Sequence, residues 1–149
     1  MISCDTNVLF PACDSSSPQH DIARSFLAGY MDRGDFCLCE QVLIELYCLL
    51  RNPVVCRRPL SGREAVAVVQ GFRSNPKWSI VDVVNDGSMM KRVWGYAEEP
   101  SFAYRRIFDV RLAVTLLRNG VTCFATRNLK DFKALGFERV WNPFEGVYG

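Results

Sequence analysis

The sequence predicts an α/β protein with a mostly parallel central sheet. Short apolar segments typical of buried strands alternate along the chain with longer segments whose apolar residues recur at helical spacing. The chain has 149 residues, of which 49% are hydrophobic and 23% charged, as is usual for a globular domain. We find no repeat and no linker, and expect residues 1–149 to form a single domain.

The first half of the chain carries clear helix signals. Residues 40–51 have a wide apolar face, and Asn52 and Pro53 end that helix. Ser61 and Glu64 have the spacing of a capping box ahead of an apolar run, which predicts a helix beginning there. The further helices expected here cover residues 21–31 and 86–97, and the turns cover 14–18 and 32–35.

The second half shows the same alternation. Asp109 is expected to cap the helix that Gly120 closes, and a short helix is expected from Asp131 to Leu135, ended by Gly136. The expected strands are residues 1–4, 36–39, 78–84, 121–125 and 139–141. Strands that alternate with helices in this way favour parallel pairing.

The residue inventory excludes several classes of function. The net charge of +2 is close to neutral, so a nucleic-acid footprint must be local. No apolar run approaches the ~20 residues of a membrane span, and the N-terminus lacks the basic start of a signal peptide. The seven cysteines include no C-x-x-C pair, so we expect reduced, mostly buried thiols and not zinc ligands. These features predict a cytoplasmic protein without membrane contact.

The single histidine, His20, limits the available chemistry. Ribonuclease mechanisms that use a histidine acid/base pair need two histidines, and so does a two-His-one-carboxylate metal site. A Ser-His-Asp triad lacks its G-x-S-x-G turn in this chain. We expect His20 to be an exposed or capping residue at the start of a helix.

Acidic and amide side chains occur where the expected strands end, and open α/β sheets bind ligands at that edge. Asp5 follows the first strand, Asp109 opens a helix, and Asn128 and Asp131 follow the strand at 121–125. Glu45 lies inside a strongly apolar helix, where an unpaired carboxylate is costly. Each acid alone also fits a structural role, such as a helix cap or a solvated helix edge. Together they predict a site for Mg²⁺, with Mn²⁺ as a substitute, because clustered carboxylates repel unless a cation neutralises them.

Four segments of the sequence resemble PIN-domain proteins of the VapC toxin type, in the order that this family has them. They are DTNVLF at 5–10, QVLIELYCLLRNP at 41–53, FDVRLAVTLLRNGV at 108–121 and ATRNLKDFKALGFERVWNPF at 125–144. The resemblance implies a three-layer α/β/α sandwich with a central, mostly parallel sheet. It also implies a Mg²⁺-dependent ribonuclease that is usually the toxin of a toxin–antitoxin pair, a homodimer, and an antitoxin whose tail lies in the active groove.

The resemblance assigns roles position by position. Asp5, Glu45 and Asp109 match the first three acids of the family. For the fourth it leaves two residues open, the Asn128 carbonyl or the Asp131 carboxylate, because Asn128 stands where many members have Asp. The residues similar to those that orient the first acid are Thr6, Asn7 and Thr126.

Arginines beside these acids are candidates for RNA contact. One group lies at residues 51–63, which contain no acid until Glu64, and another surrounds Asp109. Each group fits either phosphate contacts or a solvated face. The arginines that we expect to contact RNA are Arg105, Arg106, Arg111 and Arg127.

The mechanism expected at this stage is cleavage of RNA by a metal-activated water, which leaves a 5′-phosphate and a 3′-hydroxyl. The catalytic residues would be Asp5, Glu45, Asp109 and Asp131. The main alternative is a nucleic-acid-binding module on the same fold with weak or no catalysis. A phosphohydrolase with Asp5 as nucleophile usually needs a second Asp two residues later, but that position is Asn7. A pure interaction protein would leave the acids without a role.

Overall fold

The structure, a computed structural model, describes residues 1–83 and 86–146. Its centre is a layer of short parallel strands. Strands β1 and β4 pair in parallel, as do β4 with β5 and β2 with β3. A parallel bridge between Ile2 and Phe36 joins the two ladders, so the strand order is β3-β2-β1-β4-β5. The strands are β1 (Ile2–Cys4), β2 (Cys37–Cys39), β3 (Ser79–Val81), β4 (Cys123–Ala125) and β5 (Arg139–Trp141).

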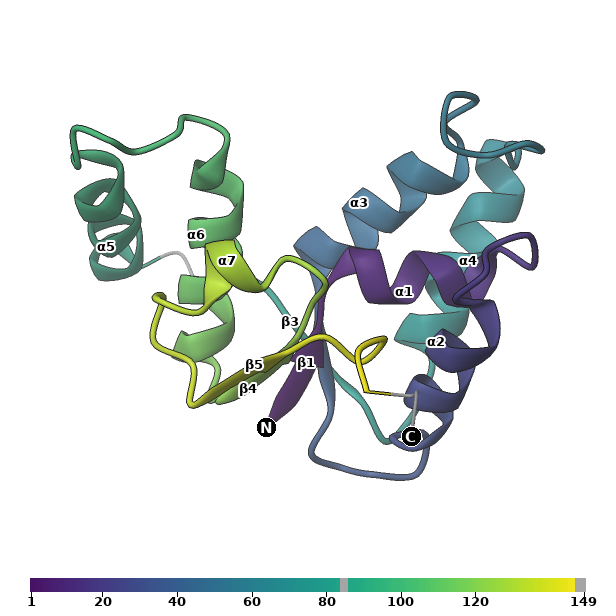
Figure 1. Ribbon diagram of the computed structural model, residues 1–149. Coiled ribbons are helices and arrows are strands. Elements are labelled where there is room, and N and C mark those ends of the chain that lie inside the picture. Colours follow the sequence, from purple (N-terminus) through teal and green to yellow (C-terminus); the bar gives the residue numbers. More distant parts are fainter. Residues whose placement is uncertain (84–85, 147–149) are drawn as a thin grey trace.

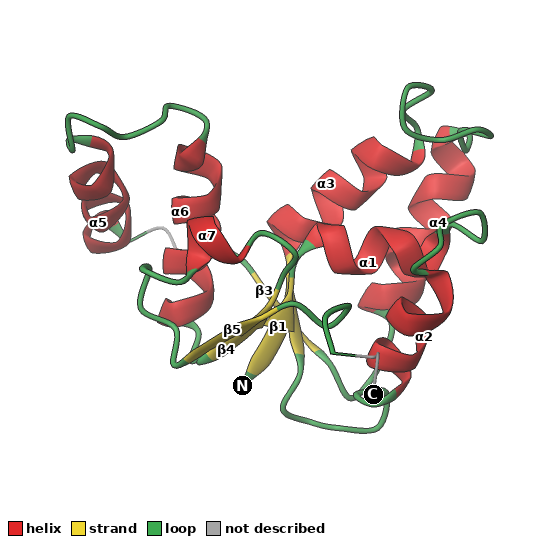
Figure 2. Cartoon of the chain, viewed as in Figure 1, coloured by secondary structure: helices red, strands yellow, loops and turns green. Residues whose placement is uncertain are grey.

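Helices cover both faces of this layer. Figure 1 shows α1 to α4 on one side of the sheet and α5 to α7 on the other, and Figure 2 shows the same three layers by element type. The helices are α1 (Thr6–Cys13), α2 (His20–Ala28), α3 (Glu40–Leu50), α4 (Gly62–Arg73), α5 (Gly87–Ala97), α6 (Arg106–Arg118) and α7 (Leu129–Phe132). The predicted three-layer α/β/α sandwich with a parallel sheet is confirmed.

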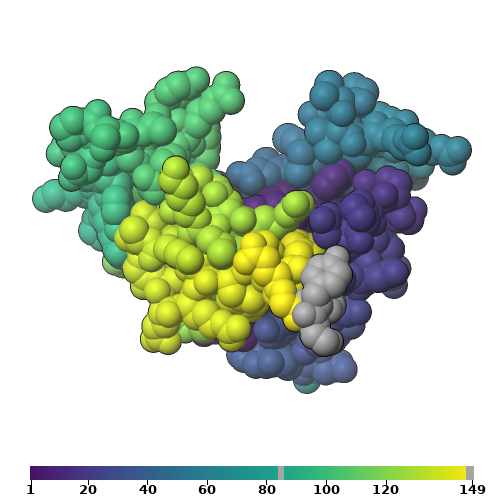
Figure 3. Space-filling view, in the orientation of Figure 1, coloured from purple at the N-terminus to yellow at the C-terminus, as the bar shows by residue number. Residues whose placement is uncertain are grey.

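The strand order creates a crevice at one edge of the sheet. The chain leaves β1 through α1 and α2 on one face and returns as β2, whereas β4 is reached through α5 and α6 on the other face. The helices therefore diverge beyond the carboxyl ends of the central strands. The space-filling view shows a notch there, between the α3–α4 side and the α5–α6 side (Figure 3).

Several local predictions match the structure. Ser61 and Glu64 form the expected capping box at the start of α4. Gly120 has a φ of 80°, and the amides of Gly120 and Val121 donate to the carbonyls of Leu117 and Leu116. This pair of hydrogen bonds is a Schellman motif, so Gly120 ends α6 as predicted.

Other local predictions were wrong. Helix α1 was not predicted, because Pro11 inside it disfavours a helix in the sequence pattern. Asp5 caps this helix by accepting a hydrogen bond from the Thr6 amide. Helix α6 begins at Arg106, so Asp109 lies in its first turn and not at its cap. The chain before it is already in turn conformation, with the Arg106 amide donating to the Ala103 carbonyl at 2.9 Å.

The last short helix also begins earlier than predicted. Helix α7 covers Leu129–Phe132, so Asp131 lies inside it and not at its start. Gly136 has a positive φ of 110°, as expected of a residue that ends a helical segment. The predicted strand at 78–84 is shorter, and its last position, residue 84, lies outside the described residues. All seven cysteines are free, as expected, but fewer are buried than predicted: three are buried, three are partly buried and Cys48 is exposed.

Candidate active site at the carboxyl edge of the sheet

Asp5 is the most constrained acid at this edge. It follows β1 directly and caps α1, and its Oδ1 accepts from the Thr6 amide at 2.7 Å. Its Oδ2 accepts from the Thr126 hydroxyl at 2.7 Å and from Asn7 Nδ2 at 2.9 Å. Thr126 follows β4, so two neighbouring parallel strands deliver the acid and one of its donors to the same point. The three residues predicted to orient Asp5 all contact it.

The hydrogen bonds around Asp5 form a closed network. Asn7 Nδ2 also donates to the Thr126 hydroxyl at 3.2 Å, and that hydroxyl accepts from the Asn128 amide at 3.0 Å. The Arg127 amide donates to Asn7 Oδ1 at 3.1 Å. The loop after β4 is therefore tied to α1, and the orientation of Asp5 depends on both elements.

The charges of Glu45 and Asp109 act on Asp5. The pKa of Asp5 is raised from 3.8 to about 6, chiefly by burial and also by the charges of Glu45 and Asp109, although the hydrogen bonds from Thr126 and Thr6 lower it. Burial is also the largest cause that raises the pKa of Asp109 to about 6, followed by the charges of Asp131 and Glu45, while Arg106 lowers it. Acids from four separate regions of the chain thus repel one another at one edge.

Glu45 projects from α3 and is half-buried. Its Oε2 accepts from the Thr6 hydroxyl at 3.0 Å, and its Oε1 accepts from Gln41 Nε2 at 3.3 Å. Both of these donors are neutral groups. Among the described residues, no basic side chain forms an ion pair with Glu45, which leaves its charge available to a cation.

Gln41 is a connecting residue that sequence reasoning did not identify. Its Nε2 donates to the Phe108 carbonyl at 3.0 Å, and its Oε1 accepts from Arg111 Nη1 at 2.9 Å. Gln41 thereby joins α3, which carries Glu45, to the first turn of α6, which carries Asp109. The available signal was its position one helical turn before Glu45, which puts both side chains on one face.

Asp131 and Asn128 lie together on the other side of the notch. Asn128 Nδ2 donates to Asp131 Oδ2 at 2.6 Å, and Arg106 Nη2 donates to the Asp131 carbonyl at 3.0 Å. Arg106 Nε stands 3.4 Å from Asp131 Oδ1, an ion-pair distance longer than a normal hydrogen bond. Unlike Asp5, this carboxylate already has a cationic partner.

The four arginines predicted to contact RNA fall into two pairs. Arg106 and Arg111 are engaged within the protein, with Asp131 and Gln41 respectively. Arg105 and Arg127 are exposed, and each guanidinium lies 5.7 Å from the centre of an aromatic ring, Tyr104 for Arg105 and Phe144 for Arg127. Within residues 1–83 and 86–146, neither arginine of the exposed pair forms an ion pair.

The side-chain oxygens at this edge of the sheet match some of the requirements of a hard divalent cation. Its ligands are carboxylate and amide oxygens, and charge repulsion among the acids would be relieved by such a cation. Within residues 1–83 and 86–146, however, no three His, Cys, Asp or Glu side chains form a ready-made metal-binding group. In the described part of the chain, the oxygen ligands at this edge therefore suit a hard cation by their chemical type but do not form a preformed cluster.

The α/β/α sandwich with acids at the carboxyl edge of its parallel sheet agrees with the PIN-type class that the four sequence segments resemble. No protein-family model matches the chain. It is 48% identical over 143 residues to Ribonuclease VapC24 of two Mycobacterium tuberculosis strains, CDC 1551 and H37Rv, over 96% of this chain and 97% of that protein. The chain belongs to the VapC family of PIN-domain ribonucleases.

Solved structures support the same fold at lower identity. FitAcB from Neisseria gonorrhoeae has a TM-score of 0.66 and 19% identity, covering 97% of this chain and 99% of that one. VapC20 from Mycobacterium tuberculosis, a Sarcin-Ricin loop cleaving toxin, has a TM-score of 0.64 and 18% identity, covering 92% and 96%. A DNA-bound VapBC from Salmonella typhimurium has a TM-score of 0.61 and 18% identity, covering 95% and 97%. No helix in the part of this chain that the structure describes could cross a bilayer.

Proposed function

We propose that this protein is a Mg²⁺-dependent endoribonuclease and the toxin of a toxin–antitoxin pair. The observation that carries the proposal is the convergence of Asp5, Glu45 and Asp109, whose charges act on one another at one edge of the sheet. The identity to Ribonuclease VapC24 supports RNA as the substrate class.

Asp5, Glu45 and Asp109 would hold the ion, some of them through water, with Asp131 or Asn128 as a fourth ligand. When bound, Mg²⁺ would lower the pKa of a water molecule and shield charge on the phosphate oxygens. Mn²⁺ would substitute for it, because both ions accept oxygen ligands.

The residues of the chain supply orientation. Thr6, Asn7 and Thr126 hold Asp5 through neutral donors, so that its carboxylate is fixed and still negative near neutral pH. In this position Asp5 can accept a proton from the attacking water. Attack by water on the phosphorus, with departure of the 3′ oxygen, leaves a 5′-phosphate and a 3′-hydroxyl.

The alternative route through a 2′-hydroxyl usually needs a second acid/base side chain such as histidine. The only histidine, His20, makes a hydrogen bond of 2.9 Å with the Pro11 carbonyl at the far end of α1 from Asp5. It lies at the start of α2, away from the acids. The water route therefore agrees better with the residues present.

The proposed partners are a cognate antitoxin and a second copy of the chain, in the cytoplasm. Several structural neighbours are complexes named FitAB or VapBC, which supports an antitoxin partner. Ile44 on α3 and Met31 after α2 are 62% and 53% exposed, and such large apolar side chains favour burial against another protein surface.

A second candidate function is RNA binding without cleavage. It is favoured by two observations: Asn128 in place of an acid, and Asp131 already paired with Arg106. The test is cleavage of a mixed RNA substrate with EDTA, and then with excess Mg²⁺ or Mn²⁺. Activity that disappears with EDTA and returns with either ion supports the nuclease, whereas cleavage that resists EDTA contradicts it. Binding without cleavage at any ion concentration supports the second candidate.

A further inference from the structure

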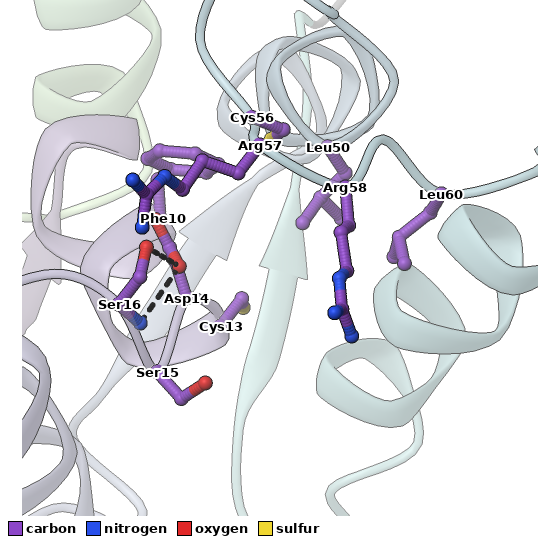
Figure 4. Close-up of a pocket in the computed structure, with 10 residues that line it drawn as sticks. All are labelled: Phe10, Cys13, Asp14, Ser15, Ser16, Leu50, Cys56, Arg57, Arg58 and Leu60. Carbon is purple, nitrogen blue, oxygen red and sulfur yellow. Dashed lines mark hydrogen bonds between the residues drawn. The ribbon is translucent and has the colours of Figure 1, made fainter.

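A separate pocket of about 410 Å³ opens at the opposite end of α1 from Asp5 (Figure 4). One wall is formed by the last turn of α1 and the residues after it, including Phe10 and Asp14. The other wall comes from the end of α3 and the loop before α4, including Arg57 and Arg58. The proposed cleavage mechanism does not use any of these residues.

The pocket and the acid site lie toward opposite ends of α1. Asn7, Phe10 and Asp14 are spaced by three and four residues, so they lie on one helical face. Asn7 contacts Asp5, whereas Phe10 and Asp14 line the pocket. With a rise of about 1.5 Å per residue, Asp14 lies about 10 Å along the helix from Asn7. Stacked nucleotides are about 3.4 Å apart, so an RNA strand crosses this distance within a few nucleotides.

The pocket combines an unshared acceptor with free cationic donors. Asp14 Oδ1 accepts from the Ser16 amide at 3.0 Å and from the Ser16 hydroxyl at 2.7 Å. Within residues 1–83 and 86–146, Asp14 Oδ2 accepts no hydrogen bond, and Arg57 and Arg58 form no ion pair. Figure 4 shows Arg57 extending to the side of Phe10 and Ser16, and Arg58 on the side of Leu50.

Asp14 on one wall and Cys56 on the other both line the pocket. The pKa of Cys13, on α1, is raised to about 11 by burial and by the charge of Asp14. The pKa of Cys56, in the opposite loop, is raised by the same two causes. Both thiols therefore stay protonated near neutral pH. The Asp14 carboxylate faces a space that the two walls share.

We propose that this pocket binds an unpaired guanine base of the RNA substrate, a few nucleotides from the bond that is cleaved. The inference rests on the proposed ribonuclease function and adds a specificity site to it. Phe10 offers an aromatic ring on which the base can stack, which is a common way in which proteins recognise unpaired RNA bases.

Guanine matches the polar groups better than the other bases. Its O6 and N7 accept hydrogen bonds, and an arginine that donates to both is the most frequent specific contact to this base. Its amino group is a donor that the free Asp14 Oδ2 can accept. A phosphate alone would be repelled by Asp14, whereas an acidic peptide would leave both Phe10 and Asp14 without partners.

The test is binding of 5′-GMP, 5′-AMP, 5′-CMP, 5′-UMP and inorganic phosphate to the full chain in EDTA, followed by calorimetry. None of these probes contains a bond that the nuclease could cut, so the result does not depend on cleavage. We expect 5′-GMP to bind about tenfold more tightly than the other nucleotides. Asp14→Asn should remove that preference, because its amide replaces one acceptor by a donor. Arg57→Ala and Arg58→Ala should each weaken 5′-GMP binding severalfold.

Arg139→Ala is the matched control, because Arg139 is an exposed arginine on β5 that does not line the pocket. Thermal melting checks that every variant folds, and Phe10→Leu tests stacking with little change in volume.

Equal binding of all five probes would show a simple anion site and overturn the inference, as would a guanine preference that survives Asp14→Asn. If RNA is cleaved in Mg²⁺ but 5′-GMP is not preferred, the proposed function stands and the inference fails. If 5′-GMP is preferred and no RNA is cleaved, the pocket assignment stands and the nuclease proposal fails.

Discussion

The two sides of the notch hold their carboxylates by different means. Beside β1, Asp5 is oriented by neutral donors from Thr6, Asn7 and Thr126. Beside α7, Asp131 is held by Asn128 and by the cationic Arg106. Neutral donors fix a carboxylate without cancelling its charge, whereas a guanidinium neutralises it. Among the described residues, no basic side chain pairs with Asp5, whereas Arg106 partly neutralises the charge of Asp131.

The largest effect expected from this difference is that of Asp5→Asn. The substitution removes the charge but keeps a side chain that can cap α1. We expect RNA cleavage to fall by at least about 10³-fold with an unchanged fold. Cleavage of a labelled RNA and circular dichroism measure the two outcomes, and Asp109→Asn should behave alike. Retained cleavage by a well-folded variant would remove the substituted residue from the mechanism.

Thr126→Val tests orientation separately from charge. Thr126 is fully buried, and valine keeps its shape but removes the hydroxyl that donates to Asp5. We expect cleavage to fall by about 10–100-fold, as for other groups that orient metal ligands. Thr115→Val is the control, since Thr115 is equally buried and its hydroxyl contacts the Arg111 carbonyl at 2.7 Å and Met89 Sδ at 4.0 Å, neither of which belongs to the acid site. Comparable losses in both variants would show that the effect is one of general stability.

The pH dependence of stability tests the crowding of the acids. The pKa of Asp5 and that of Asp109 are raised from 3.8 to about 6 in the folded chain. Between these values the folded state binds more protons than the unfolded state, so stability falls as the pH rises through this window. In EDTA, we expect the Tm to be about 2–4 °C higher at pH 5 than at pH 7.

Asp5→Asn should remove much of that change, because its amide does not titrate. Asp35, Glu64 and Asp86 have lowered pKa values, so their stabilising effect is lost only at more acidic pH. A Tm that falls steadily from pH 7 to pH 5 would contradict the crowding of the acids at the notch.

The fold and the meeting of the acids at one edge follow from patterns that are local in the sequence. Alternating strands and helices predict a parallel sheet, and a residue directly after a strand, such as Asp5, must lie at its carboxyl edge. Asp109 was predicted at the carboxyl edge of the sheet because it was expected to cap a helix, and that reason was wrong. It lies within the first turn of α6, because the turn that starts the helix comes from residues with no capping signal.

Other features depend on contacts between distant residues, which no local pattern contains. Gln41 connects α3 to the Phe108 carbonyl, and a lone amide on a helix gives no sign of such a partner. The pairing of Asp131 with Arg106 spans 25 residues and depends on how α6 meets α7. The pocket at Phe10 likewise needs the helix α1 that Pro11 concealed. Sequence reasoning thus reaches the acids and misses the residues that couple them.

The smallest effect is expected from Arg106→Gln, which tests the compensated side of the notch. The substitution removes the cation beside Asp131 and keeps a donor for the Asp131 carbonyl. Because Arg106 lowers the pKa of Asp109, its removal should raise that pKa further and move the acidic limb of the pH–rate profile to higher pH. At neutral pH we expect only a fewfold loss of cleavage, roughly the effect of one partly exposed ion pair.

Arg139→Gln, on β5 and away from the acids, is the control for a lost surface charge. Asp131→Asn completes the comparison, since it removes the carboxylate but leaves Arg106 in place. If the two sides differ as the structure indicates, Asp131→Asn costs far less activity than Asp5→Asn. Equal losses from these two substitutions would mean that Arg106 releases Asp131 during the reaction, and the contrast between the two sides would not hold.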